Sequence, residues 1–364
     1  MNQPATPAIT NVAGGSQTER RRVSTRRDFA VCSLAFYGRA EPSEWSPNMT
    51  PTRKLVIFPG SGSQGFTSAI CKHLKVKPGR CEAKHFSEGN TFVRVLENVR
   101  GRDVFFVQSL SYPVNDHLLE ILFYVDAFRR ASAESVTAVI PFFSYGKGDK
   151  KDEPRVSIRA RVVADCLEAA GVDRIMTMDL HAPQIQGFFR VPVDHLYAQP
   201  AIANHFRKKI NRNWVVVAPD VGAAKMANAY AKSFGTTTAI AEKTRPDHRE
   251  NAVVTRLIGN VEGKNALIVD DFTISGGTLV ATAKRLKEEG AKDVYACVAH
   301  GVMTAGSAAR IEASPIKEMV VTDTIEHRFE PFGKKIKIAS VAPLFAEAIN
   351  SVFRQTSVSK LFEV

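Results

Sequence analysis

Short apolar runs alternate with amphipathic segments along most of the chain. Each run has the length of a buried strand and is followed, after a polar or glycine-containing turn, by apolar residues at helical spacing. The predicted strands are 55–58, 104–108, 136–141, 174–178, 214–218, 237–241, 267–269, 294–298 and 318–321, and the predicted helices are 63–74, 117–131, 158–170, 201–209, 223–233 and one that carries Leu279, Ala283 and Leu286. Strands separated by helices pair in parallel through right-handed crossovers, so the pattern predicts an α/β fold of mainly parallel sheets flanked by helices.

The series of strands and helices restarts near the middle of the chain, which predicts two similar domains. A loop ends near Ala198, and Pro200 opens the next helix. We therefore place an N-terminal domain at residues 54–198 and a C-terminal domain at residues 199–349, and we expect the tail 350–364 to pack back on the first. A chain of 364 residues that is 44% hydrophobic can bury two cores.

Residues 1–53 differ from the rest of the chain. They are rich in Pro, Ser, Thr and Arg and have no sustained apolar period, which predicts a disordered extension. Arg26 and Arg27 faintly match a twin-arginine export signal, but the apolar run 29–37 is short and polar residues follow at once. An organellar transit peptide is the alternative, and four acidic residues among the first 48 oppose it. Because Met49 stands directly before the first strand, we expect translation to begin there naturally. Native protein whose intact mass starts at Met1 would contradict this.

Composition narrows the classes of partner. The formal charge of +12 admits nucleic acid or phosphorylated small molecules, but the basic residues are spread along the chain and do not alternate with aromatics. The five cysteines form no CxxC pair, which fits a reducing, cytoplasmic compartment. No apolar run approaches the roughly 18 residues of a membrane span. We therefore expect neither nucleic acid nor a membrane as a partner.

The segment 267–278 reads Leu-Ile-Val-Asp-Asp-Phe-Thr-Ile-Ser-Gly-Gly-Thr. An apolar run ends at Asp270 and Asp271, and a hydroxyl- and glycine-rich turn, Ser275 to Thr278, leads into the next helix. Such a turn at the carboxyl end of a strand offers N–H groups and a favourable dipole to a phosphate. Carboxylates repel phosphate, so the acidic pair suits the hydroxyls of an attached sugar, or a cation. The motif predicts a sugar-phosphate site; its alternative is a capped helix after two solvated acids.

Two further strand ends carry acids. The strand 174–178 is followed by Asp179 and His181, which suit a divalent metal or a phosphate and equally suit a cap for the next turn. Asp220 precedes Gly222 and a helix, where an N-cap is the simpler explanation.

Two polar loops follow other strands. The loop 144–155 is dense in lysines, and the loop 242–249 contains Lys243 and Arg245. Either is a solvated surface when taken alone. A flexible cationic loop can also stabilise charge that develops during phosphoryl transfer. Jointly, these strand ends indicate metal-assisted transfer between two phosphorylated ligands.

From about Lys54 to Phe362 the chain resembles the ribose-phosphate pyrophosphokinases, or phosphoribosyl diphosphate synthetases. The segments that carry the resemblance are 139–141, 149–152, 177–182, 184–189, 192–197 and 267–278. The resemblance implies two tandem phosphoribosyltransferase-type (type I) domains. It also implies transfer of the pyrophosphoryl group of ATP to the C1 hydroxyl of ribose 5-phosphate, which gives phosphoribosyl diphosphate and AMP.

The resemblance further implies roles for individual residues. Ribose 5-phosphate is assigned to Asp270, Asp271, Ser275, Gly276, Gly277 and Thr278, and ATP to Phe86, Lys147, Asp149, Lys150 and His181. Mg²⁺ is placed near His181 and Asp220, and Lys243 and Arg245 are the catalytic cations of the flexible loop. A regulatory phosphate and ADP site is assigned to Arg100, Arg155, Gln186, Ser357 and Ser359. Phe86 stacks on adenine from a neighbouring subunit, so a dimer-based assembly, commonly a hexamer, is implied.

Several positions depart from the pattern of this family. Ile274 stands where an acid is usual, Ser275 where threonine is usual, and Lys147 and Gly148 where arginine and glutamine are usual beside ATP. Glu88 and Asn90 also differ, near adenine. The preferred nucleotide and the regulatory class stay open. The glycine pair 276–277 is closer to the phosphate-independent plant-type class, whereas the carboxyl end resembles the allosteric class.

Three rival functions remain. An ordinary phosphoribosyltransferase would consume phosphoribosyl diphosphate, but the two domains and the loop 149–152 argue against it. A non-catalytic regulatory paralogue is supported by Ile274 and opposed by the retained His181 and Lys243. A nucleic-acid binder rests on charge alone.

Overall fold

The structure is a computed structural model that describes residues 54–244, 253–326 and 331–361. The predicted extension 1–53 therefore lies outside the described residues. The strands are β1 Lys54–Pro59, β2 Cys81–His85, β3 Thr91–Val95, β4 Arg102–Val107, β5 Ser135–Ile140, β6 Arg174–Met178, β7 Val193–Leu196, β8 Trp214–Ala218, β9 Thr237–Thr244, β10 Val253–Ile258, β11 Asn265–Thr273, β12 Val294–Gly301, β13 Ile316–Thr322 and β14 Ile336–Ala339. The α-helices are α1 Gln64–Leu74, α2 Val114–Arg130, α3 Arg159–Ala170, α4 Gln199–Phe206, α5 Ala224–Phe234, α6 Gly277–Glu288, α7 Ser307–Glu312 and α8 Ala342–Phe353, and the 3-10 helices are η1 Ser144–Gly148, η2 Pro183–Phe188, η3 Val221–Ala223 and η4 Ser359–Leu361.

The first half of the chain forms a five-stranded sheet. Its order is β1-β4-β5-β6-β7, and every neighbouring pair is parallel. Alternate residues of each strand face opposite sides of a sheet. On one side, Val56 and Phe58 pack against α2 and α3, and on the other Ile57 packs in a cluster that contains α1 and α8. The predicted parallel sheet with helices on both faces is confirmed.

The second half forms a seven-stranded sheet of order β10-β9-β8-β11-β12-β13-β14. All pairs are parallel except the pair of β9 and β10 at one edge. Helices α4 and α5 cover one face, and α6 and α7 cover the other. Strand β8 is buried at every position. A parallel strand covered on both faces has a continuous run of apolar residues, and for this reason the sequence predicted β8 correctly.

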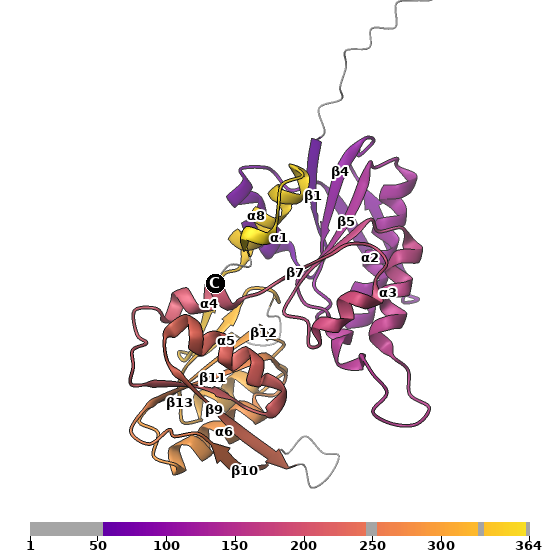
Figure 1. The fold of residues 1–364 in the computed structure, drawn as a ribbon. Coiled ribbons are helices and arrows are strands. Elements are labelled where there is room, and N and C mark those ends of the chain that lie inside the picture. Colours follow the sequence, from indigo (N-terminus) through magenta and orange to yellow (C-terminus); the bar gives the residue numbers. More distant parts are fainter. Residues whose placement is uncertain (1–53, 245–252, 327–330, 362–364) are drawn as a thin grey trace, which may run out of the picture. The chain divides into compact units, whose positions relative to one another are not determined.

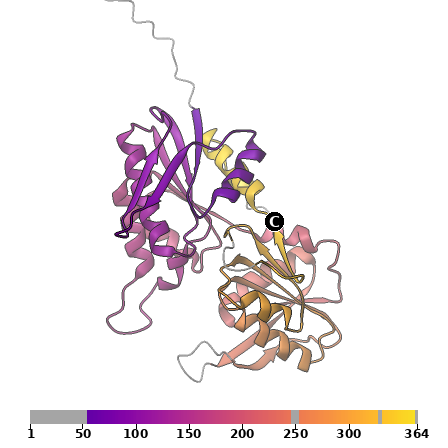
Figure 2. The ribbon, with the colours of Figure 1, turned by 180° about the vertical axis from the view of Figure 1, so that it is seen from behind.

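The C-terminal helix returns to the first sheet. Helix α8 lies beside α1 in both views (Figure 1 and Figure 2), and the rings of Phe66 and Phe345 meet edge to face at 5.3 Å between centroids. Val358 and Leu361 pack against the same cluster of buried residues. That cluster also contains residues of both sheets, and the chain from Thr52 onward forms one compact unit. Helix α4 begins at Gln199, and the domain boundary after residue 198 stays a prediction.

Several elements have no counterpart in the sequence prediction. They are β2, β3, β7, β10, β14, α7 and α8. Strands β2 and β3 form a separate antiparallel ribbon that contacts α2. Their residues are mostly half-buried or exposed and include charged side chains, so they lack the apolar run of a core strand. No helix within the described ranges is long and apolar enough to span a bilayer.

Candidate functional site

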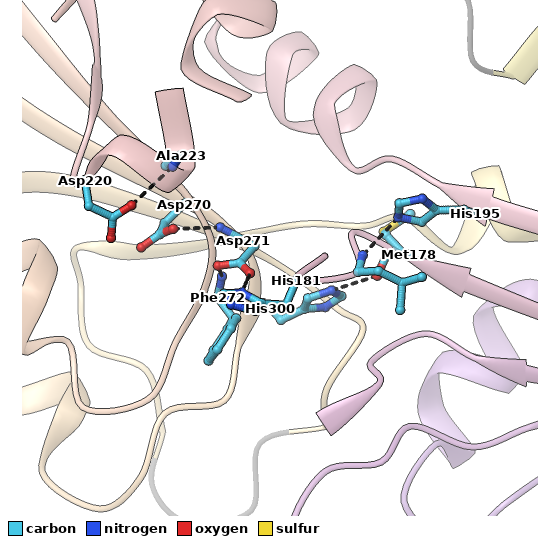
Figure 3. Close-up of polar contacts among 10 residues, drawn as sticks. Met178, His181, His195, Asp220, Ala223, Asp270, Asp271, Phe272 and His300 are labelled. Carbon is cyan, nitrogen blue, oxygen red and sulfur yellow. Dashed lines mark hydrogen bonds and ion pairs between the residues drawn. The ribbon is translucent and has the colours of Figure 1, made fainter. Parts of the chain in front are cut away.

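Strand β11 carries the acidic pair of the predicted sugar-phosphate motif. The prediction that this strand ends at Val269 was wrong, because its pairing with β12 continues to Thr273. Asp270 and Asp271 therefore lie within the last residues of the strand and are half-buried. The backbone N–H of Asp271 donates to Oδ1 of Asp270 at 3.1 Å, and the N–H of Phe272 donates to Oδ1 of Asp271 at 2.8 Å (Figure 3). The carboxylates are thus held at the carboxyl edge of the sheet.

The turn after β11, residues 275–278, is the predicted phosphate cradle and leads directly into α6. Gly276 adopts φ +76°, a left-handed conformation that favours glycine, and it precedes the first residue of α6. The N–H of Gly276 donates to Thr273 Oγ1 at 3.2 Å, and that of Gly277 to Ser275 Oγ at 3.3 Å. Gly277 and Thr278 belong to the first turn of the helix, where N–H groups and the helix dipole favour an anion.

A neighbouring segment braces this cradle. The hydroxyl of Ser307 donates to the carbonyl of Ile274 at 2.9 Å, and Nη1 of Arg310 donates to the carbonyl of Ser275 at 3.1 Å. Arg310 is exposed, so its guanidinium adds positive charge beside the cradle. Its role was not predicted, because α7 carries no sequence signal that connects it with the motif.

The Asp-x-His turn after β6 meets this motif directly. Nδ1 of His181 lies 2.6 Å from Oδ2 of Asp271 (Figure 3), so the structure brings together two sites that the sequence predicts separately. The hydrogen bond with Asp271 raises the pKa of His181, although partial burial opposes the increase. The positive charge of Lys147 lowers the pKa of His181, and the negative charge of Asp149 raises it.

Buried groups hold the turn in place. Asp179 has φ +38°, and its Oδ2 accepts from the N–H of Ala198 at 2.7 Å. The N–H of Leu180 donates to Nε2 of His195 at 2.9 Å, and Nε2 of His300 lies 3.0 Å from the carbonyl oxygen of Met178 (Figure 3). The carboxylate of Asp179 thus bonds the residue before α4, and η2, the helix that follows the turn, has no side-chain cap, whereas His181 projects towards the acidic pair.

Burial shifts the ionisation of these supporting groups. It raises the pKa of Asp179 to about 7 and lowers the pKa values of His195 and His300 to about 4. Both histidines are consequently neutral near pH 7. A neutral imidazole provides one donor and one acceptor, which matches the two partners of the His300 ring, the Met178 carbonyl and the Thr324 hydroxyl.

A small pocket lies where η1, the β6 turn and β11 meet. Its lining includes Phe142, Lys147, His181, Phe272 and His300. The ammonium of Lys147 lies 4.4 Å from the centroid of the Phe272 ring, a cation–π contact that joins η1 to the end of β11. Phe272 was not predicted as a site residue, because its role depends on the register between sheets and not on a motif.

Other residues assigned to ATP lie apart from this contact. The Lys150 ammonium is exposed and lies 3.6 Å from Asp152 Oδ1. Phe86 follows β2 and is 46% exposed, with its ring 6.1 Å from that of Phe92. An exposed phenyl ring on a surface ribbon is available to another molecule, but no described contact joins it to His181.

Asp220 caps η3, as the simpler prediction held. Its Oδ1 accepts from the N–H of Ala223 at 3.2 Å, and Figure 3 shows it beside Asp270. Throughout the described ranges, no group of three or more His, Cys, Asp or Glu side chains is arranged to hold a metal ion. Mg²⁺ is commonly bound by one or two carboxylates together with substrate phosphates and water. The carboxylates of this edge fit that mode.

Two predicted catalytic residues fall at the margin of the described chain. Lys243 belongs to β9, but its side chain lies outside the described part, and Arg245 lies outside the described residues altogether.

The residues assigned to regulation are distributed over several elements. Arg100 and Arg155 are exposed, and Gln186 donates to the carbonyl of Pro183 at 2.9 Å. Ser357 and Ser359 lie in the C-terminal segment, where Ser357 Oγ accepts from the N–H of Ser359 at 3.1 Å. Apart from this bond, no described interaction joins any two of the five residues.

Comparison with known proteins assigns the chain to a family. Residues 55–171 match the N-terminal domain of ribose phosphate pyrophosphokinase, and residues 236–363 match the phosphoribosyl synthetase-associated domain. The ribose-phosphate pyrophosphokinase of Caldanaerobacter subterraneus is 46% identical over 312 residues, which cover 85% of this chain and 98% of that protein. That of Porphyromonas gingivalis is 45% identical over 315 residues, covering 86% and 99%. The crystal structure of phosphoribosylpyrophosphate synthetase from Mycobacterium smegmatis superposes with a TM-score of 0.79 at 37% identity, covering 83% of this chain and all of that one. The chain therefore belongs to the ribose-phosphate pyrophosphokinase family.

Proposed function

We propose that this enzyme transfers the pyrophosphoryl group of ATP to the C1 hydroxyl of ribose 5-phosphate, which gives 5-phosphoribosyl 1-diphosphate and AMP for nucleotide biosynthesis. The observation that carries the proposal is the 2.6 Å contact between His181 Nδ1 and Asp271 Oδ2. It joins the residue assigned to the nucleotide with the motif assigned to the sugar. Family membership gives the reaction, and this contact supports the proposal that the two substrates meet here.

On the sugar side, the cradle from Ser275 to Thr278 binds the 5-phosphate, and Asp270 and Asp271 accept hydrogen bonds from the ribose hydroxyls. The N–H groups at the start of α6 supply the anion site. Arg310, fixed to the Ser275 carbonyl at 3.1 Å, adds positive charge next to it. Ile274 supplies no charge, so the two aspartates carry the recognition of the sugar.

On the nucleotide side, Lys147, Asp149, Lys150 and His181 bind the triphosphate, and Phe86 stacks on adenine of a neighbouring subunit. The cation–π contact with Phe272 supports the position of Lys147. This loop has a lysine and a glycine where relatives use other residues, and we place ATP as the donor on the strength of the family.

Asp220 and His181 would hold Mg²⁺ together with phosphate oxygens. The ion, when bound, neutralises the charge of the phosphates. The residues of the chain orient the C1 hydroxyl in line with the β-phosphorus. The C1 oxygen forms a bond to that phosphorus as the bond from it to the α,β-bridging oxygen breaks. AMP leaves with the bridging oxygen, and the hydroxyl proton is released, so no covalent enzyme intermediate is required.

We also propose self-association in a dimer-based assembly, a hexamer in the manner of the family. Helix α2 exposes Leu119 and Phe123 one turn apart, and Phe86 is exposed on the neighbouring ribbon. Apolar side chains gathered on a surface favour association. The four cysteines of the described chain are free, which supports a reducing, cytoplasmic setting.

Replacing the loop cations tests the catalytic roles. We expect Lys243→Ala and Arg245→Ala each to lower kcat by about 10²–10³, because cationic donors stabilise the charge of the transferring group. Melting temperatures should stay close to that of the wild type. The matched control is Lys232→Ala, which removes an exposed cation from α5 and should leave kcat unchanged. Wild-type turnover in either loop variant would refute the assignment.

The alternative is a non-catalytic regulatory paralogue that assembles with active subunits. The observation in its favour is Ile274, an apolar residue in the cradle whose carbonyl is already occupied by Ser307. A folded oligomer that produces no AMP alone, yet alters the turnover of an active relative after co-assembly, would support this alternative.

A further inference from the structure

His300 links the two sheets beneath the candidate active site. It lies in β12, opposite Phe272 of β11, and is 1% exposed. Its Nε2 lies 3.0 Å from the carbonyl oxygen of Met178, the last residue of β6 (Figure 3). A carbonyl only accepts, so Nε2 carries the proton and donates. His300 thus makes a directed contact from the seven-stranded sheet to the end of a strand in the five-stranded sheet.

The other ring nitrogen is also fixed. Nδ1 lies 2.9 Å from Thr324 Oγ1, and in this tautomer it accepts from that hydroxyl. The carbonyl of Thr324 accepts from the hydroxyl of Ser109, which follows β4 in the first sheet. The imidazole and Thr324 together therefore link the last residue of β6 to the loop that follows β4.

The carbonyl that accepts from His300 belongs to the peptide group at the start of the Asp179–His181 turn. It joins Met178 to Asp179, whose φ of +38° is uncommon for a residue with a side chain. Such conformations cost free energy and persist only where the surroundings fix them. Ala198, Leu196 and His195 bond the same turn from its own sheet, and His300 bonds it from the other.

The ring of His300 also forms part of the pocket. Its centroid lies 4.9 Å from that of Phe142, and Phe142 lies 6.2 Å from Phe272. These rings line the pocket that His181 and Lys147 share. A change at position 300 therefore reaches the site through the turn and through the pocket wall.

We infer that His300 is a positioning residue for the reaction, which acts by holding the Met178 carbonyl so that His181 is presented to Asp271. The inference rests on the proposed function for its kinetic consequence. Burial lowers the pKa of His300 to about 4, so the neutral, donating form persists across the working range of pH. The side chain itself touches no reacting atom; its effect passes through the Asp179–His181 turn.

The decisive variants are His300→Leu and His300→Gln. Leucine fills a similar volume without a donor, whereas the glutamine amide can still donate to the Met178 carbonyl. We expect His300→Leu to lower kcat by about 10- to 100-fold, since a displacement of about 1 Å can cost that much. His300→Gln should recover most of the loss. Thr324→Val, which removes only the partner of Nδ1, is the milder variant and should lower kcat less.

A double-mutant cycle separates positioning from loss of stability. If His300 acts through His181, adding His300→Leu to His181→Ala should cause little further loss of kcat. The matched control is Val294→Ala, a cavity variant at the other end of the same buried strand. It should lower the melting temperature without a comparable loss of kcat. Additive losses in the cycle, or equal loss of kcat in Val294→Ala, would overturn the inference.

NMR spectroscopy tests the positioning role of His300 without any measurement of turnover. Side-chain ¹H–¹⁵N NMR should show His300 as the neutral Nε2–H tautomer. The ring signals of His181 should shift in His300→Leu and return in His300→Gln. Unchanged His181 signals in His300→Leu would refute the positioning role even if the wild type made no AMP. Absence of AMP from the wild type, with the His181 signals moving as expected, would refute the proposed function and leave the structural role of His300 standing.

Discussion

Asp271 is the residue at which the two halves of the site meet. Its Oδ2 contacts His181 from the β6 turn, and its Oδ1 accepts from the backbone of Phe272. Its side chain is 13% exposed, and that of His181 is 43% exposed. A carboxylate so placed contacts a histidine while it keeps some exposure to the site. Because both of its oxygens are engaged, substrate binding must replace or share the contact with His181.

Buried titrating groups under this contact predict how stability depends on pH. Burial holds the pKa of His195 and His300 at about 4, against 6.5 in an unfolded chain. Between these values the unfolded state binds more protons, so their contribution to stability is lost as pH falls from 6.5 towards 4. Asp179 acts in the opposite direction, because its pKa of about 7 lets the native state hold a proton that the unfolded chain releases above about pH 4. Asp179 thereby cancels the effect that one of the two histidines has on the pH dependence of stability.

We expect His195→Gln to flatten the acid side of the stability profile. Urea unfolding between pH 5 and 6.5 should show the free energy of unfolding of the wild type falling on acidification more steeply than that of the variant. The difference should approach ~1.4 kcal/mol per pH unit, the limit for one proton. Lys232→Ala serves as the control with an unchanged slope. Parallel profiles for wild type and His195→Gln would show that burial does not hold this histidine neutral.

At the scale of elements, the cradle depends on one short turn and its brace. A methyl group at Gly276 would combine a left-handed backbone with a Cβ 3.2 Å from Ile311 Cδ1. Gly263 has a similar φ of +68°, but nothing lies within 4 Å of the position of its Cβ. The two glycines therefore separate backbone strain from crowding at the site.

We expect Gly276→Ala to weaken binding of ribose 5-phosphate by at least about tenfold and to cost about 1–3 kcal/mol of stability, because the turn must distort. Gly263→Ala should cost stability for the same backbone reason and leave the affinity for the sugar phosphate unchanged. Titration calorimetry and thermal unfolding measure the two quantities. Equal affinity in wild type and Gly276→Ala would contradict the role of the turn.

Elements differed in how far the sequence could predict them. Strand β8 is buried at every position and apolar along its length, and β5 is buried at all but its first residue and mostly apolar, so the sequence predicted both strands. Strands β2 and β14 are short and expose charged residues, so their patterns resemble loops. The end of β11 was predicted too early, because Asp270 and Asp271 look like loop residues although β12 keeps pairing with them.

The residues of the site also differ in how far the sequence could predict them. Asp271 and His181 were predictable because they stand in local motifs at strand ends. Their direct contact was not, because it depends on how two sheets meet. Phe272, His300 and Arg310 carry no local signal at all, and they become visible only through the pairing of β11 with β12 and the packing of α7. The sequence therefore indicates the chemistry of the site more readily than its supporting structure.

At the scale of the molecule, one buried cluster includes residues of both sheets and the returning helix α8. Phe345 is fully buried in it and meets Phe66 of α1 edge to face. Aromatic pairs of this kind add to the stabilisation from buried area. The C-terminal helix thus stabilises the beginning of the fold, although it follows the last strand of the second sheet.

We expect Phe345→Ala to lower the free energy of unfolding by about 3–5 kcal/mol, the usual cost of removing a buried phenyl ring. The control is Ile338→Ala, because Ile338 is 53% exposed on β14 and its truncation should change stability by less than about 0.5 kcal/mol. Denaturant unfolding of both variants measures the difference. A loss in Phe345→Ala no larger than in the control would contradict this account of how α8 contributes.

The central claim is tested most directly by identifying the nucleotide that the purified protein releases. The protein is incubated with Mg²⁺, ATP and ribose 5-phosphate, and the nucleotides and sugar products are separated and quantified. We predict AMP and 5-phosphoribosyl 1-diphosphate in equal amounts, and no AMP when the sugar phosphate is omitted. Release of ADP in place of AMP, or AMP formed equally well without the sugar phosphate, would contradict pyrophosphoryl transfer at this site.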